Sequence, residues 1–496
     1  MKARRPLPSA RKLWRVEDGQ TLEFPLPSKP NDMAWRDYLI MLLHVGAEIE
    51  HALMVQYLYA AYSLDDQKGL PAQRRQVAEW RDLILTVAKE EMGHLLTVQN
   101  LLCLVGGPVC FDRSHFPFDT VYLPFPFRLE PLSVTSVAWY VYAEAPQDWQ
   151  VLLRAHSAQR RVRTTADITR VAKIVGSQVV TGHSHTVGQL YDRIIEVISN
   201  PDWISDADFR PETYAQQASW DDWGRGYAPA PAAPGTVTPP RQGVGERSNV
   251  LIMQMATRTE AIAALKEIGG QGESAHLTLK QEQEPSHFDR FLHLLDQFSR
   301  HGHKWGVVHR VPVNPSTMGR NQRPPGSTAI SHPTSLLWAR LFNLRYRALL
   351  NFLGLTFRLA RRVAPDEPNV RGAVMHRIFG EMYNIKALSG ILVRQPLTKL
   401  KKSATRAACA APPFEMPYSL ELPESEADCW RLHLDILQSS MELCGSLLRG
   451  HGGKQAPTLT PRETSYLRTL EQLDQKSAEW MKQIIVGLNR PGGQPA

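Results

Sequence analysis

The sequence has few cysteines and no long apolar run. The five cysteines are an odd number and include no Cys-x-x-Cys pair, which argues against a disulfide framework or a zinc ribbon and fits a reducing cytoplasm. No 18-residue apolar run occurs, and no apolar stretch follows the basic N-terminus. We therefore expect neither a membrane span nor a secretory signal. A basic run interleaved with aromatic residues is also missing, which leaves nucleic-acid binding weakly supported.

The composition is that of a soluble globular protein, with 43% hydrophobic and 21% charged residues in 496 positions. This length predicts two or three domains. The net charge of +8 is compatible with a protein that handles anionic small molecules. Proline, glycine and polar clusters predict four parts: a surface segment at 1–32, a first helical domain at 33–300, a linker at 301–333, and a second helical domain at 334–496.

The stretch from Glu79 to Cys103 has apolar residues at helical spacing and only one glycine, Gly93. Glu91 and His94 lie in the middle of its apolar face. An unpartnered carboxylate in such a face would cost several kcal/mol. Residues three apart project from neighbouring positions on one helical face, which is how helix bundles present metal ligands inward. The pair therefore predicts a buried metal site.

A helix capped by Asn31 and Asp32 and running to about Leu64 would present Glu50 within a second apolar face. The short loop that follows predicts antiparallel packing against the first helix. Glu50 is then a candidate ligand. The alternative is a structural carboxylate satisfied by a tyrosine or arginine.

Four Glu-x-x-His pairs occur before residue 300, where the composition predicts roughly one by chance. Besides Glu91/His94, the pair Glu284/His287 opens a helical stretch and supplies candidate ligands. The pair Glu48/His51 lies largely off the face of Glu50, so we expect a structural or supporting role. The role of Glu273/His276 is left open.

A third long helix is expected between residues 165 and 199. Carboxylate-type di-iron bundles take one Glu from each of two helices and a Glu-x-x-His from each of the other two. The position expected to carry the remaining acid is Gln189. A neutral amide is a poorer ligand for a hard cation, so a second ion would be weakly held. The mixed oxygen and imidazole shell favours non-haem iron or manganese over zinc, with one or two ions.

Several motifs occur in an order that resembles the ferritin-like domain of the iminophenyl-pyruvate dimer synthase family, known from violacein- and rebeccamycin-type bisindole pathways. They span roughly Met33–Phe298 and are AEIEHALMVQYLYAAYSL, AKEEMGHLLTVQNLLCLVGG, PFRLEPLS, VGQLYDRI, QGES and SHFDRF. A looser resemblance continues into the last third. No stretch of the chain predicts a convincing sheet, so we expect an all-α fold. The resemblance implies that a ferritin-like four-helix bundle is followed by a second helical domain. Many relatives carry Glu in the VGQLY motif, so Gln189 is a departure.

The resemblance implies an iron-dependent oxidative enzyme of specialised metabolism that acts on amino-acid-derived imines or amines with dioxygen or a peroxide. The ligand pattern carries over onto Glu50, Glu91, His94, Glu284 and His287, and we expect Glu91 and His94 to act in catalysis. The chain is about half the length of the full bisindole synthases, so their reaction does not transfer directly.

Arg128 in the PFRLEPLS loop is a candidate carboxylate anchor, because a guanidinium binds a carboxylate through two parallel hydrogen bonds. The alternative is an exposed or structural arginine. Two alternative hypotheses are an iron-binding protein or ferroxidase, and a metal-free partner of an amino-acid oxidase. The irregular loops and the second domain argue against a simple storage cage.

Overall fold

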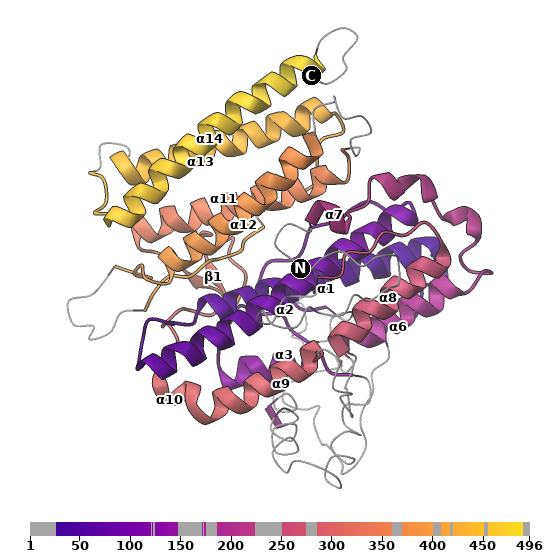
Figure 1. The fold of residues 1–496 in the computed structure, drawn as a ribbon, viewed down its shortest axis with the longest axis horizontal. Coiled ribbons are helices and arrows are strands. Elements are labelled where there is room, and N and C mark those ends of the chain that lie inside the picture. Colours follow the sequence, from indigo (N-terminus) through magenta and orange to yellow (C-terminus); the bar gives the residue numbers. More distant parts are fainter. Residues whose placement is uncertain are drawn as a thin grey trace, which may run out of the picture.

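The computed structural model describes residues 26–120, 122, 125–146, 171, 173–174, 186–223, 250–273, 285–359, 370–399, 408–416, 420–450 and 455–489. Within these residues the regular secondary structure is almost entirely helical (Figure 1). The strands there are the short β1 (Pro315–Ser316) and β2 (Thr328–Ala329), which pair in parallel with Pro315 opposite Thr328. The predicted all-α class is confirmed.

Two long helices, α1 (Trp35–Tyr62) and α2 (Pro71–Leu104), pack against each other along the bundle. Pro71 suits the first helical position of α2, because its missing N–H would have no partner there. The Gln73 side chain accepts a hydrogen bond from the Leu70 backbone N–H at 2.9 Å. The predicted cap of α1 at Asn31 and Asp32 is wrong, since the helix begins three residues later without a side-chain cap.

The other half of the bundle is built from two pairs of shorter helices. At one end α3 (Val134–Ala143) packs against α9 (His287–Gln297), and at the other α6 (Val187–Ser199) packs against α8 (Arg258–Glu273) (Figure 1). The Ser133 and Ser286 hydroxyls cap α3 and α9 by accepting backbone N–H groups. Much of the predicted helix at 165–199 lies outside the described residues.

Gly93 allows the backbone before α8 to approach α2 closely. A Cβ atom at this position would lie 2.8 Å from the Leu251 carbonyl oxygen, which is too close for a side chain to be accommodated. The approaching segment is held by α2 side chains, because the Thr97 hydroxyl donates to the Leu251 carbonyl at 3.0 Å and the Asn100 amide to the Met253 carbonyl at 2.8 Å. A glycine that interrupts the helical pattern therefore positions a neighbouring element.

A second group of helices stacks on α1 and α2, with α11 and α12 nearer and α13 and α14 farther away (Figure 1). At its centre the buried Arg345 guanidinium donates to Glu381 and to Asp474, at 2.6 Å and 2.7 Å. Burying a charge is costly unless it is paired and hydrogen-bonded, so this network fixes how the helices meet. The group comprises α11 (Pro333–Thr356), α12 (Val370–Leu392), α13 (Glu426–Arg449) and α14 (Pro461–Leu488).

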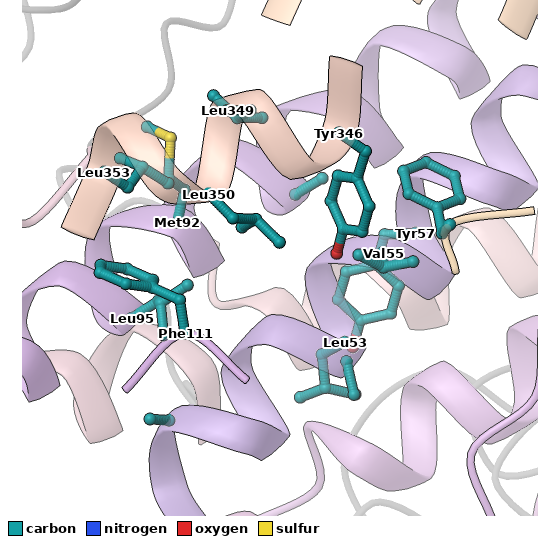
Figure 2. Packing of buried hydrophobic residues seen from close by; sticks show 14 of the residues in the cluster. Leu53, Val55, Tyr57, Met92, Leu95, Phe111, Tyr346, Leu349, Leu350 and Leu353 are labelled. Carbon is teal, nitrogen blue, oxygen red and sulfur yellow. The ribbon is translucent and has the colours of Figure 1, made fainter. Parts of the chain in front are cut away.

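The two groups share one apolar core. Figure 2 shows Leu350 and Leu353 of α11 beside Met92 of α2 and Phe111, all of which belong to the same buried cluster. Nearby, the Tyr346 hydroxyl hydrogen-bonds His51 of α1. The packed interface fixes α11 over the stretch of α2 that carries Glu91 and His94.

The predicted linker at 301–333 packs against the bundle. The Asp65 backbone N–H donates to the Val307 carbonyl at 2.8 Å, and the Leu129 N–H to the Asn314 side chain at 2.7 Å. Short elements lie in and near it and before α8: η2 (Asp206–Asp208), η3 (Pro211–Ala215), α7 (Trp220–Trp223), η4 (Phe298–Gly302) and α10 (His303–Trp305).

Helix α1 is long and apolar enough to cross a membrane by length and composition alone, contrary to the expectation from the sequence. However, 67% of its most apolar window is buried inside the protein. It also carries the buried polar residues Glu50 and His51. These features are those of a core helix in a bundle.

Candidate metal centre

Helices α1 and α2 bring three predicted ligands together. Glu50, Glu91 and His94 are only 2%, 1% and 3% exposed. His94 Nδ1 lies 2.9 Å from Glu91 Oε2 and 3.6 Å from Glu50 Oε2. Each residue can offer one ligand atom such that these atoms all lie within 4.8 Å of one another. This group is large enough to hold one metal ion.

A second group forms on the other half of the bundle. Glu144 follows the last residue of α3, and His287 is the first residue of α9. His287 Nδ1 lies 2.8 Å from Glu91 Oε1 and 3.5 Å from Glu144 Oε2. Glu91, Glu144 and His287 again offer ligand atoms within 4.8 Å of one another. Glu91 belongs to both groups, so its two oxygens face two adjacent positions.

Three buried atoms in these groups make no well-aligned hydrogen bond within the described part of the chain: Glu50 Oε2, and the pair Glu91 Oε1 and His287 Nδ1, which lie 2.8 Å from each other as an ion pair. An unsatisfied buried carboxylate oxygen is costly, so these atoms fit the ligands of a cation. The donors are carboxylate oxygens and imidazole nitrogens without a thiolate, which suits iron or manganese.

Residues around the ligands fix their orientation. The Tyr191 and Tyr57 hydroxyls donate to Glu50 and Glu144, respectively. Each imidazole turns Nδ1 toward the carboxylates of the two groups, while Nε2 of His94 contacts Gln271 and Nε2 of His287 contacts Glu90. Such outer contacts orient metal ligands and tune their basicity.

The electrostatics of the cluster favour bound positive charge. Burial lowers the pKa of His94, but Glu91 and Glu50 outweigh it and raise the pKa to about 10. The pKa of His287 is raised well above its usual value, because Glu91, Glu144 and Glu90 outweigh burial. Burial, followed by the charge of Glu91, raises the pKa of Glu50 to about 7. The excess negative charge that holds protons on the imidazoles also favours a metal cation.

One predicted ligand, Glu284, is not described with this cluster, and another, Gln189, lies elsewhere. Glu284 and the side chain of Glu273 lie outside the described residues. The Gln189 side chain caps α6 by accepting the Thr186 backbone N–H at 3.0 Å. Tyr191, two residues farther along, reaches Glu50 instead. Side chains two apart on a helix point in different directions, so the expectation that Gln189 supplies the ligand from the third helix does not match this placement.

The residue that occupies this place is Glu144, which sequence reasoning missed as a ligand. Its signal was present: Glu144 ends an apolar helical run, Val134–Ala143, that contains no other acid. An expectation that places the ligand in the middle of a continuous helix does not select a residue that follows a helix end. In the described residues Glu144 directly follows the end of α3, and α6 is a separate helix.

The remaining predicted residues lie outside the cluster. Glu48 accepts the Ser114 backbone N–H at 2.8 Å. His51 contacts Tyr346, and burial, together with Arg113, lowers its pKa well below the usual value. Arg128 is exposed and lines a cavity. The other residues that line it are Gln56, Phe125, Pro126, Glu130, Ser136, Trp139 and Tyr140.

Comparisons with known proteins agree with this architecture. Residues 43–296 match the family described as Ferritin-like. Dichlorochromopyrrolate synthase from Lentzea aerocolonigenes is 24% identical over 77% of this chain and 36% of its own length. The 2-imino-3-(indol-3-yl)propanoate dimerase of Chromobacterium violaceum is 31% identical over 27% of this chain and 16% of its own length.

The chain thus spans little more than a third of the length of the first relative and less of the second. A ferritin-like protein from Caulobacter vibrioides has a solved structure with 18% identity and a TM-score of 0.39, and the match covers 73% of this chain and 97% of that one. Because the family match covers half of the sequence and includes the ligand-bearing helices, the chain belongs to the ferritin-like family.

Proposed function

We propose that the protein is a non-haem iron enzyme of specialised metabolism that oxidises an amino-acid-derived imine or amine, by oxidative coupling or oxygenation. The observation that carries this proposal is the pair of buried groups, Glu50/Glu91/His94 and Glu91/Glu144/His287, that share Glu91. Two carboxylate and imidazole groups joined in this way fit a two-ion centre of the kind built in ferritin-like bundles.

The ligands would hold the ions between the two halves of the bundle, and the surrounding core would exclude bulk water. Iron bound there would supply redox chemistry with dioxygen or a peroxide. Glu91 would bind both ions, while Glu50 and His94 would serve one position and Glu144 and His287 the other. Tyr57 and Tyr191 would keep the terminal carboxylates oriented through their hydroxyl groups.

The substrate class is supported by the cavity that contains Arg128. The names of both curated relatives describe biosynthetic reactions, and one names an imino acid with an indole ring. Such a substrate has a carboxylate and an aromatic ring. Arg128 can bind the carboxylate, and Trp139 and Phe125 in the same cavity can contact the ring.

The cavity adjoins the candidate metal centre through two aromatic residues. The Tyr140 ring, which lines the cavity, lies edge-to-face against Tyr57 with centroids 4.8 Å apart. The Tyr57 hydroxyl donates to Glu144. A substrate in the cavity would therefore be separated from a ligand of the metal by this pair of tyrosines.

The proposed imine would come from a partner amino-acid oxidase, which converts the amine of an amino acid into an imine. We place both proteins in the cytoplasm, with no nucleic acid or membrane partner. An iron-binding or ferroxidase role uses the same centre without the cavity. A metal-free partner role uses neither.

The test combines metal loading with an imine supply. Protein loaded anaerobically with Fe²⁺ is mixed in air with an L-amino-acid oxidase and L-tryptophan, and the imine products are followed by mass spectrometry. We expect a new oxidised or coupled product that disappears in Glu91→Gln and persists in Glu48→Gln, a matched acid on α1 outside the cluster. Arg128→Gln should raise KM more than it lowers kcat.

The alternatives give different results. Oxidation of Fe²⁺ without any change in the imine would support the ferroxidase role and contradict the proposal. Absence of bound metal, together with unchanged imine, would support the metal-free partner.

A further inference from the structure

The two imidazoles of the centre face different chemical groups on their outer side. Both His94 and His287 turn Nδ1 toward the cluster carboxylates. If Nδ1 binds the metal, Nε2 carries the hydrogen and donates it outward. The strength of the outer acceptor then sets how strongly each imidazole donates to its metal.

The outer acceptor of His287 is a carboxylate. His287 Nε2 lies 3.0 Å from Glu90 Oε2, and Glu90 is fully buried. The same carboxylate oxygen accepts a hydrogen bond from Arg290 Nη1 at 2.8 Å. Arg290 is on the same helix as His287, one turn along, so α9 supplies both the ligand and the group that fixes its carboxylate partner.

The outer acceptor of His94 is a neutral amide. His94 Nε2 lies 2.8 Å from Gln271 Oε1, near the end of α8. A hydrogen bond to a charged group is roughly twice as strong as one between neutral groups. Gln271 therefore polarises His94 less than Glu90 polarises His287.

We infer that the centre is built with two unequal metal positions, and that Glu90 and Gln271 are the positioning residues that set the difference. The position of Glu144 and His287 is the tight one, and the position of Glu50 and His94 is the weak one. This inference rests on the proposed metal centre. It adds a ranking of the two positions and the residues responsible for it.

The test uses Mn²⁺ alone, with no turnover. Full-length protein is stripped with a chelator and titrated with Mn²⁺, and the free ion is followed by its electron paramagnetic resonance signal. The wild type should bind in two distinguishable phases. Glu90→Gln should weaken the tight phase on the order of 10–100-fold and leave the weak phase unchanged. Gln271→Glu should tighten the weak phase instead.

Glu90→Gln leaves the Arg290 guanidinium beside a neutral amide, and this variant can fail to fold for that reason alone. In that case Gln271→Glu still tests the inference. A gain in affinity confined to one phase is not expected from a merely structural residue. Glu144→Gln identifies the tight phase by abolishing it, and the matched control Glu48→Gln should change neither phase.

Binding of two Mn²⁺ ions with equal affinity in the wild type, or an equal loss of affinity in both phases in Glu90→Gln, would overturn the inference. Neither result would contradict the proposed metal centre. Loss of the weak phase alone in Glu144→Gln would reverse the ranking and also overturn the inference. No binding of Mn²⁺ or Fe²⁺ to the wild type would overturn the proposed metal centre itself.

Discussion

At the scale of single residues, position decides what a glutamate does in this protein. Glu91 faces both groups of the centre, and its neighbour Glu90 points to the outer side of His287. Glu48, two residues from Glu50, accepts a backbone N–H from a loop. Successive side chains on a helix are about 100° apart, so adjacent acids of one sequence motif reach different surroundings.

The positions of Gln189 and Glu144 predict different changes in metal content for the substitutions Gln189→Glu and Glu144→Gln. Gln189→Glu should leave the metal content unchanged, because the side chain caps α6 and a carboxylate can accept the same N–H. Glu144→Gln should remove about one ion per chain, because it neutralises a ligand of one group. Metal per chain after anaerobic loading and dialysis measures both.

Wild-type metal content in Glu144→Gln, or an additional ion in Gln189→Glu, would contradict this assignment. Circular dichroism of each variant controls for loss of helix.

The sequence was sufficient to select the candidate ligands that lie inside regular helices and that the fold brings together. Glu50, Glu91 and His94 interrupt apolar faces that periodicity reveals, and His287 belongs to a recurring spacing motif. Helical periodicity does not reveal the roles of Glu144 and Glu90. One follows a helix end, and the direction of the other is set by a partner, His287, almost two hundred residues away.

At the scale of elements, helix packing also buries groups that have no role in the centre. His433 of α13 stacks on Phe352 of α11, with ring centroids 4.0 Å apart. Neither ring nitrogen of His433 has a hydrogen-bond partner within the described residues. Burial, and secondly Arg347, lowers the pKa of His433 to about 3. The imidazole is therefore neutral in the folded protein.

This burial predicts a loss of stability in mild acid. Unfolded histidine binds a proton below about pH 6.5, whereas folded His433 stays neutral down to about pH 3. The unfolded state binds more protons in this window, so the free energy of unfolding falls as the pH falls. His433→Leu should remove about 2 kcal/mol of the loss between pH 7.5 and 5. Urea unfolding at the two pH values measures it.

The exposed His376 on α12 serves as the matched control, and His376→Gln should retain the wild-type pH dependence. An equal pH dependence of the free energy of unfolding in the wild type and in His433→Leu would contradict this prediction. It would show that His433 also binds a proton between pH 7.5 and 5 in the folded protein.

The helices of the fold were largely predictable because long apolar periodicity is a strong signal. The bundle has two continuous helices, α1 and α2, and the sequence predicted both. The other half is divided into α3 with α9 and α6 with α8. No local pattern shows that pieces far apart in the chain complete one side of a bundle, since that depends on tertiary packing.

At the scale of the whole molecule, the bundle and the second group of helices share a core. Leu350 of α11 is 1% exposed and lies near Met92 of α2, two residues before His94 (Figure 2). The predicted linker contacts both groups, because the Thr317 hydroxyl accepts the side-chain amide of Asn343 on α11 at 3.4 Å and the Pro312 carbonyl accepts the Tyr59 hydroxyl of α1. Continuous packing of this kind favours cooperative unfolding.

Truncation at the shared core should therefore affect the whole protein. Leu350→Ala should destabilise it by about 2–5 kcal/mol through lost burial and the cavity left behind. We expect one calorimetric transition that moves to lower temperature. Bound Mn²⁺ should raise the temperature of the same transition, and removal of Mn²⁺ with a chelator should lower that temperature again.

Leu473→Ala is the matched control, because Leu473 on α14 is 50% exposed and its truncation should change little. Two transitions, of which only one responds to Leu350→Ala or to metal, would show that the two groups unfold independently.

The division of the centre between distant parts of the chain also sets an order of events during synthesis. The hairpin of α1 and α2 is complete once Leu104 has left the ribosome, and it already carries Glu50, Glu91 and His94. Glu144 follows some forty residues later, but His287 emerges only about 180 residues after Leu104. The first group of candidate ligands is thus synthesised long before the second group is complete. The second group can form only when α9 docks beside α3.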